Sequence, residues 1–187
     1  MDQFLEILGF TIGILYLWWE YHADRRVWLA SVVMPMISMW IYFSKGLYAD
    51  FAINIYYLII AVYGFIAWTR GAVKEKGKPR AITHITLPVG AACVLASGAL
   101  WWLIWLLLTR LTDSTVPVAD AFTTALSIVG MWMMARKYAE QWLVWIIVDF
   151  VCVGLYYYKG IYFYTGLYAI YTVIACFGYR KWVKMIA

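Results

Sequence analysis

The most informative part of the chain is residues 28–68, WLASVVMPMISMWIYFSKGLYADFAINIYYLIIAVYGFIAW. The chain repeats this stretch 114 residues later, and the repeat indicates the architecture of the whole protein. Residues 142–182 align with it without a gap and share 11 identities in 41 positions. Apolar composition common to both stretches would account for only ~4 identities. The identical pairs are Trp28/Trp142, Leu29/Leu143, Tyr42/Tyr156, Lys45/Lys159, Gly46/Gly160, Tyr48/Tyr162, Tyr57/Tyr171, Ile60/Ile174, Ala61/Ala175, Gly64/Gly178 and Trp68/Trp182.

The composition around the repeat places the chain in a membrane. Of its 187 residues, 66% are apolar and 13% are charged. A soluble domain has roughly 25% charged and 45–50% apolar residues, so this chain lacks the polar surface that a water-facing globule needs. The apolar runs are long and continuous, which favours helices over the short alternating strands of a barrel. We therefore expect an all-α integral membrane protein.

The apolar runs predict seven transmembrane helices, at roughly 4–21, 27–43, 48–68, 85–108, 119–135, 141–158 and 161–179. With seven crossings, 12 of the 15 lysines and arginines fall on one side of the membrane. The positive-inside rule makes this side cytoplasmic, so we expect the N-terminus outside and the C-terminus in the cytoplasm. The net charge of +5 is then explained by these loops, and no nucleic-acid partner is expected.

The repeat and the helix count together predict one transporter domain, residues 1–187, in a 3+1+3 arrangement. Repeat one covers about 4–68, a linker helix about 85–108, and repeat two about 119–182. Three helices and one linker helix return the chain to its starting side, so the two three-helix repeats are expected to be parallel. Such an arrangement places a transport pathway between two halves that can rock against each other.

Asp149 is the strongest candidate for a ligand-binding residue. It lies nine residues after Glu140, which is ~13 Å along a helix and close to the membrane midplane. Trp142, Trp145, Asp149 and Tyr156 share one helix face. A carboxylate beside two indoles suits a flat organic cation. The alternative is a structural role, in which Asp149 bonds a neighbouring Tyr or Trp of a packed bundle.

The first repeat has different residues at the positions equivalent to these. Pro35 stands where the second repeat has Asp149, and it removes a backbone hydrogen bond, so it is either a hinge of its helix or a static bend. Asn54 stands where the second repeat has Tyr168, and both are expected to hydrogen-bond a ligand. Glu20 and Asp120 fall at helix ends, where a surface or capping role is expected.

The sequence contains none of the signals that we associate with catalysis. It has no HExxH, GxSxG or Walker motif, and its two histidines, His22 and His84, are expected near the membrane edges without partners. The three cysteines, Cys93, Cys152 and Cys176, lie in apolar runs without the spacing of a metal site. We therefore expect no catalytic residue, no metal and no cofactor.

Two stretches carry a resemblance to a known family. One is Arg136-Lys137-Tyr138 and Glu140-Gln141-Trp142-x-x-Trp145-x-x-x-Asp149, followed by Lys159-Gly160 and Gly178-Tyr179-Arg180-Lys181-Trp182. The other is its first-repeat counterpart, Leu47–Asp50 and Tyr63–Trp68. Both resemble the Pnu family of bacterial vitamin transporters, over nearly the whole chain except for residues 70–118 in detail.

The resemblance implies a 3+1+3 helix arrangement similar in outline to the SWEET sugar transporters. It implies facilitated diffusion of an unphosphorylated B-type vitamin through a multi-pass protein of the bacterial inner membrane. A cytoplasmic vitamin kinase would then trap the vitamin by phosphorylation. The family also implies a homo-oligomer, a trimer, in the lipid bilayer.

The residue at position 149 indicates which vitamin the chain carries. The nicotinamide riboside branch has asparagine where this chain has Asp149, so the resemblance favours thiamine, with nicotinamide riboside and riboflavin as alternatives. Carried over by position, Trp142 and Trp145 would stack on the ring system, Asp149 would pair with the thiazolium or aminopyrimidine, and Asn54 would contact the vitamin from the first repeat. The positions of Tyr156 and Tyr168 make them further candidates for contact with the vitamin. An alternative of another class is a substrate-capture subunit of a larger transporter, although an internal repeat argues against it.

Overall fold

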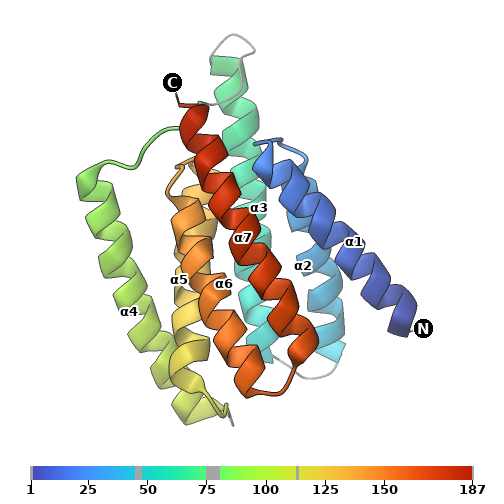
Figure 1. The fold of residues 1–187 in the computed structure, drawn as a ribbon. Coiled ribbons are helices and arrows are strands. Elements are labelled where there is room, and N and C mark those ends of the chain that lie inside the picture. Colours follow the sequence, from blue (N-terminus) through green and yellow to red (C-terminus); the bar gives the residue numbers. More distant parts are fainter. Residues whose placement is uncertain (1, 45–47, 75–80, 113, 187) are drawn as a thin grey trace. The chain divides into compact units, whose positions relative to one another are not determined.

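Seven helices make up the chain in the computed structural model, which describes residues 2–44, 48–74, 81–112 and 114–186 (Figure 1). They are α1 (Asp2–Tyr21), α2 (Val27–Ser44), α3 (Tyr48–Lys74), α4 (Leu87–Leu111), α5 (Pro117–Ala135), α6 (Gln141–Tyr158) and α7 (Tyr162–Lys184). The prediction of seven helices is confirmed. The largest differences are at the ends of α3 and α7, which continue beyond residues 68 and 179, because an apolar run measures the membrane crossing and not the whole helix.

Four of these helices are long and apolar enough to cross a membrane, counting the described residues alone. They are α4, α5, α6 and the segment Ile53–Arg70 of α3. The helix α7 is predicted to cross as well, but it carries five tyrosines, and tyrosine adds little to hydropathy. Crossing by α1, α2 and α7 therefore stays a prediction from the repeat and the charge pattern.

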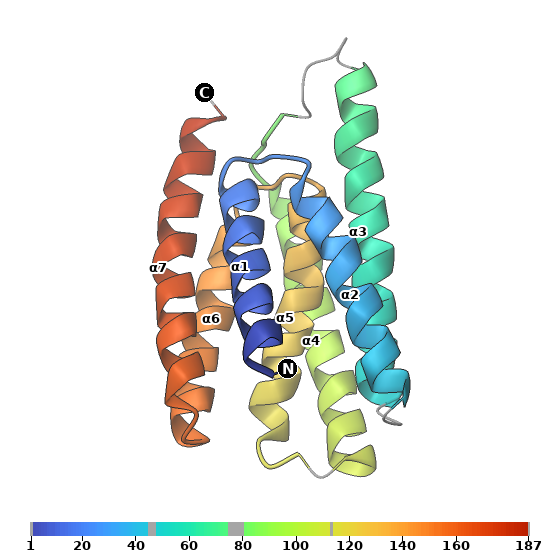
Figure 2. The ribbon, with the colours of Figure 1, turned by 90° about the vertical axis from the view of Figure 1, so that its right-hand side faces the viewer.

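The helices fall into two compact units, Met1–Arg80 and Ala81–Ala187. In the first unit α2 packs against both α1 and α3 (Figure 2). Trp28 of α2 is fully buried, and its ring meets that of Trp68 of α3 edge to face, with centroids 5.5 Å apart. A Cβ atom added at Gly64 would overlap the Trp28 indole. The absence of a side chain at Gly64 therefore lets α2 and α3 approach closely.

The second unit is a row of neighbours in which α4 packs on α5, α5 on α6, and α6 on α7 (Figures 1 and 2). Trp142 of α6 is 1% exposed and meets Trp182 of α7 edge to face, with centroids 5.9 Å apart. A Cβ atom at Gly178 would lie 2.7 Å from the Trp142 ring. This Trp–Gly–Trp packing has the same residue types, at the same spacing, as that in the first unit.

The turns that precede α2 and α6 also match. Ala23 and Lys137 are the described non-glycine residues with positive φ, at 52° and 58°. Ala23 N–H donates to the carbonyl of Glu20, and Asp24 N–H to that of Trp19. In the second unit Lys137 N–H donates to Met134 and Tyr138 N–H to Met133, which are the same two bonds 114 residues later. Both are left-handed helix caps of the Schellman type.

The segment before α4 is tied to the α5–α6 turn. Thr83 N–H donates to the carbonyl of Lys137, and Ala139 N–H donates to the carbonyl of Thr83. The Glu140 carboxylate lies 2.6 Å from His84 Nδ1 and accepts the Ile85 N–H at 2.9 Å. The expectation that His84 has no partner is therefore wrong. His22 also has one, since its Nδ1 lies 2.8 Å from the Trp18 carbonyl oxygen.

The two acidic residues that were expected at helix ends differ from each other. Asp120 lies in the first turn of α5, where Oδ1 is 3.5 Å from Lys159 Nζ and Oδ2 accepts a bond from Ser114. Glu20 is only 2% exposed, so a surface role for it is wrong. The last turn of α1 is packed against other parts of the protein. The position of Glu20 near a helix end in the sequence did not indicate this burial.

Candidate functional site

The helix α6 contacts its two neighbours along two different lines. On one side Trp142 fills the space over Gly178 of α7. On another, Val144 reaches α5, where a Cβ atom added at Gly130 would lie 3.2 Å from Val144 Cγ1. Each residue turns an α-helix by 100°, so the direction of every side chain around α6 follows from its number. Four residues point into the sector between these two contacts and together span about 80° of the helix circumference: Gln141, Trp145, Asp149 and Tyr156. We call these four residues the polar face of α6.

Asp149 lies at the middle of the polar face. It is 8% exposed. In the described part of the chain, no hydrogen bond or ion pair reaches its carboxylate, so the bond to a neighbouring Tyr or Trp that a structural role requires is not made there. Its charge is close enough to Tyr168 and Tyr171 of α7 to interact with both electrostatically. A carboxylate buried without a partner is costly, which makes Asp149 a functional candidate.

Stacked tyrosines continue the site toward the end of α6. The rings of Tyr156 and Tyr168 lie nearly parallel, with centroids 5.1 Å apart and an interplanar angle of 14°. The ring of Tyr164 also stacks with that of Tyr156, with centroids 5.3 Å apart. The structure thus brings three predicted site residues, Asp149, Tyr156 and Tyr168, to one region of α6 and α7.

The two predicted tryptophans differ in what they can do. Trp142 is enclosed by Gly178 and Trp182, and its counterpart Trp28 has the same surroundings in the first unit. This gives Trp142 a packing role, and contact of its ring with a ligand stays a prediction. Trp145 is half-buried on the polar face, and its ring lies 3.6 Å from a Cβ atom added at Gly130 of α5. Its buried indole N–H, like that of Trp142, has no hydrogen-bond partner among the described residues.

The predicted residues of the first unit lie on α2 and α3. Pro35 is buried, and α2 remains helical through it, so its role as a hinge stays a prediction. Asn54 is half-buried on α3, and its contact with a ligand also stays a prediction. Lys45 and Gly46, which the repeat pairs with Lys159 and Gly160, lie outside the described residues.

One polar-face residue, Gln141, was not predicted as a site residue. It is fully buried at the first position of α6, and neither its amide oxygen nor its amide nitrogen has a hydrogen-bond partner in the described residues. Little in the sequence indicated this burial, since a glutamine next to Glu140 at a helix start is usually solvated.

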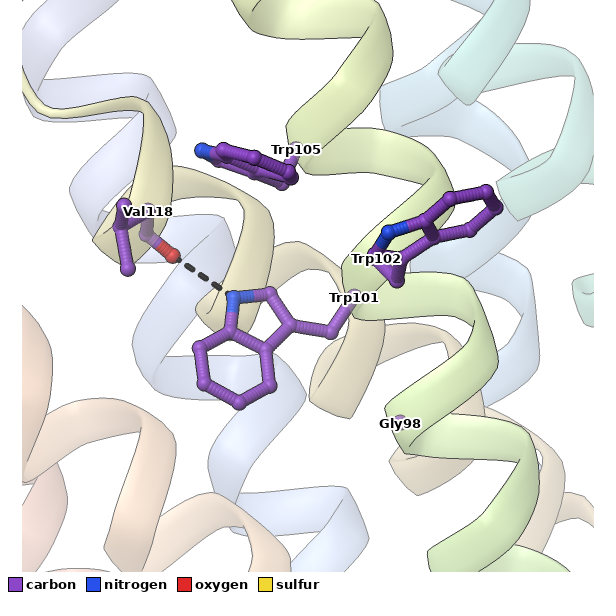
Figure 3. Close-up of a pocket in the computed structure, with 5 residues that line it drawn as sticks. All are labelled: Gly98, Trp101, Trp102, Trp105 and Val118. Atoms are coloured by element: carbon purple, nitrogen blue, oxygen red, sulfur yellow. Dashed lines mark hydrogen bonds between the residues drawn. The ribbon is translucent and has the colours of Figure 1, made fainter.

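Two hollows beside α4 have a different character. The first has a volume of about 250 Å³, and Figure 3 shows the rings of Trp101, Trp102 and Trp105 around it. Trp101 Nε1 donates to the Val118 carbonyl at 3.0 Å. The second, of about 480 Å³, runs between α4, α5 and α6 and is lined almost entirely by apolar side chains. Both suit hydrocarbon better than a polar vitamin.

The chain is similar to known transporters over most of its length. A family model described as "Nicotinamide mononucleotide transporter" matches residues 3–184. The nicotinamide riboside transporter PnuC of Escherichia coli is 29% identical, over 97% of this chain and 86% of that protein. The riboflavin/roseoflavin transporter RibM of Streptomyces davaonensis is 24% identical, over 95% of this chain and 83% of that protein.

A solved structure shows a similar fold. The crystal structure of the vitamin B3 transporter PnuC superimposes with a TM-score of 0.70 and 21% sequence identity. The similarity covers 94% of this chain and 78% of that one. The seven helices are therefore those of a known transporter fold.

Proposed function

Because the chain belongs to the nicotinamide mononucleotide transporter family, the family of the Pnu vitamin transporters, we propose that it carries nicotinamide riboside across the bacterial inner membrane. The observation that carries this proposal is the Asp149 carboxylate, buried without a partner beside aromatic rings of α6 and α7. Nicotinamide riboside is a flat pyridinium cation, and such a carboxylate together with aromatic faces suits a flat cation.

This proposal replaces the thiamine preference. The preference depended on Asp149 standing where nicotinamide riboside transporters have asparagine, and both vitamins are flat cations that a carboxylate can pair with. The similar proteins described above are named for nicotinamide riboside and riboflavin, and none of them for thiamine. Riboflavin is the second candidate, favoured by the similarity to RibM over 95% of this chain.

The proposed mechanism uses two parallel three-helix repeats joined by α4, a 3+1+3 arrangement. It is supported by the Trp–Gly–Trp packing that recurs at Trp28 and Trp142 and by the matching caps at Ala23 and Lys137. Two equivalent halves can expose a site to each side in turn, without an ion gradient or ATP. A cytoplasmic kinase would then trap the vitamin. Assembly into a trimer would cover part of α4, which has no buried residue in the single chain.

The test is uptake by proteoliposomes that contain this chain alone. We expect saturable, gradient-driven entry of labelled nicotinamide riboside, and no entry into protein-free liposomes. Riboflavin and thiamine are assayed in parallel, and saturable entry of either one alone would assign the transporter to that vitamin. Binding without entry would contradict transport by the chain itself and favour a substrate-capture subunit.

A further inference from the structure

The buried amide of Gln141 on the polar face has no part in the proposed function. Its side chain is 0% exposed, yet both amide atoms lack hydrogen-bond partners among the described residues. Leaving buried donors or acceptors unpaired costs free energy, and native structures contain few such groups. An amide placed this way has a donor nitrogen and an acceptor oxygen ready for a partner that carries the complementary pair.

The polar face of α6 places this amide in line with the other candidates. Gln141, Trp145 and Asp149 are spaced i, i+4 and i+8, so Gln141 and Asp149 lie ~12 Å apart along the helix with Trp145 midway. The indole N–H of Trp145 is also buried without a partner in the described region. From the start of α6 to the middle of the polar face, these three residues therefore offer an amide, an aromatic ring and a carboxylate in that order.

The first unit allows the polar face of α6 to be compared with the equivalent positions of α2. Where α6 has Gln141, Trp145 and Asp149, α2 has Val27, Ser31 and Pro35. Ser31 donates to its own helix, at the Val27 carbonyl. The packing residue Trp142, in contrast, is matched by Trp28. The residues that hold the helices together are thus alike in the two units, whereas those of the polar face differ, as expected when only one face meets an asymmetric ligand.

We propose that Gln141 is a specificity-determining residue that pairs its amide with the donor–acceptor edge of a heterocyclic vitamin. The inference rests on the proposed function. A primary carboxamide, as in nicotinamide riboside, has such an edge on a flat ring, with a ribose at the far end. The ring would then lie at Trp145, and its cationic nitrogen, the atom that carries the ribose, would face Asp149. A carboxylate in place of the carboxamide has no N–H donor and leaves the Gln141 oxygen unpaired.

The test compares Gln141→Met with Leu143→Met, a control on the same helix whose side chain is 39% exposed. Binding is followed by tryptophan fluorescence with nicotinamide riboside, nicotinic acid riboside, riboflavin and thiamine. We expect the unmodified protein to favour nicotinamide riboside over nicotinic acid riboside. Gln141→Met should weaken nicotinamide riboside binding about tenfold to hundredfold and remove that discrimination, while Leu143→Met keeps both.

Thermal unfolding separates binding from packing. Methionine removes an unpaired buried amide at nearly constant volume, so Gln141→Met should unfold at an unchanged or higher temperature despite its weaker binding. Parallel losses of affinity and unfolding temperature would assign Gln141 a structural role and overturn the inference. Unchanged affinity and discrimination in Gln141→Met would overturn it as well, and leave the proposed function standing. Failure of the unmodified protein to bind any of the vitamins would overturn both.

Discussion

The indole of Trp142 lies against Gly178 so closely that a Cβ atom there would come within 2.7 Å of the ring, and Trp28 stands in the same relation to Gly64. Each tryptophan is also held edge to face by a second one, Trp182 or Trp68. Neither ring can move without losing buried contact area. The two glycines therefore set how closely α6 approaches α7 and α2 approaches α3.

Gly178→Ala is expected to destabilise the second unit, because the added methyl overlaps a ring that is enclosed by its neighbours. Overpacking of this kind costs about 1–3 kcal/mol, and we expect the purified protein to unfold several degrees lower. Gly166→Ala on the same helix is the control, since no atom lies within 4 Å of its added Cβ. Equal unfolding temperatures for the two variants would contradict the close approach of α6 and α7.

Trp145→Ala and Trp142→Ala are expected to separate binding from packing. Trp145→Ala should weaken vitamin binding with a small change in unfolding temperature, because Trp145 is half-buried on the polar face. Trp142→Ala should lower the free energy of unfolding by about 3–5 kcal/mol, the range for a buried tryptophan. Fluorescence titration and thermal unfolding of both variants check this. Normal vitamin binding by Trp145→Ala would exclude stacking on its ring.

Asp149→Asn is expected to weaken binding of nicotinamide riboside by roughly tenfold, since the amide keeps the shape of the side chain and removes the charge that pairs with the cation. Asp24→Asn is the matched control, because Asp24 already pairs with Arg26 at 2.7 Å, outside the helices. Affinity is measured by fluorescence titration. If Asp149→Asn binds as tightly as the unmodified protein, charge pairing at this residue is wrong.

Ala23→Gly is expected to stabilise the protein by up to about 1 kcal/mol, because alanine at φ 52° is strained and glycine is not. Ala30→Gly, inside α2, should instead lower the free energy of unfolding by about 1 kcal/mol. Thermal unfolding of the two variants gives the comparison. Destabilisation by both would show that the turn after α1 has no left-handed residue.

Glu140→Ala is expected to loosen the segment before α4, because the carboxylate holds both His84 and the Ile85 N–H. Hydrogen bonds to charged groups contribute about 1.5–3 kcal/mol, so amide hydrogen exchange over residues 82–86 should become roughly tenfold faster or more. Exchange in the turn at Ala23 serves as the internal reference. Unchanged exchange at 82–86 would mean that the bonds of Thr83 hold the segment without Glu140.

The sequence predicted the helices well, because membrane helices are long apolar runs that end at charged or turn-forming residues. The burial of Asp149 also followed from the sequence, since a carboxylate deep in such a run is conspicuous, whereas its contact with a ligand stays a prediction. The packing role of Trp142 was not found, because its partners Gly178 and Trp182 lie on another helix, and the spacing to Trp145 and Asp149 suggested one shared surface.

Other features depend on contacts that no local pattern reveals. Gln141 stands beside Glu140 at the start of a helix, where glutamine is normally solvated, and its burial follows from tertiary packing. The left-handed conformations of Ala23 and Lys137 were not predicted, because glycine or asparagine is the usual sign of such a cap. The partner of His84, Glu140, lies far along the chain and becomes its neighbour only when the segment before α4 joins the α5–α6 turn.

The matching caps at Ala23 and Lys137 show that one turn can be built from different residues. The φ angles and the two backbone bonds agree although alanine faces lysine, so the shape of the turn does not depend on the side chain at its left-handed position. A turn that its backbone bonds define in this way leaves the side chains around it free to vary. Vitamin preference can then differ between related chains without a new architecture.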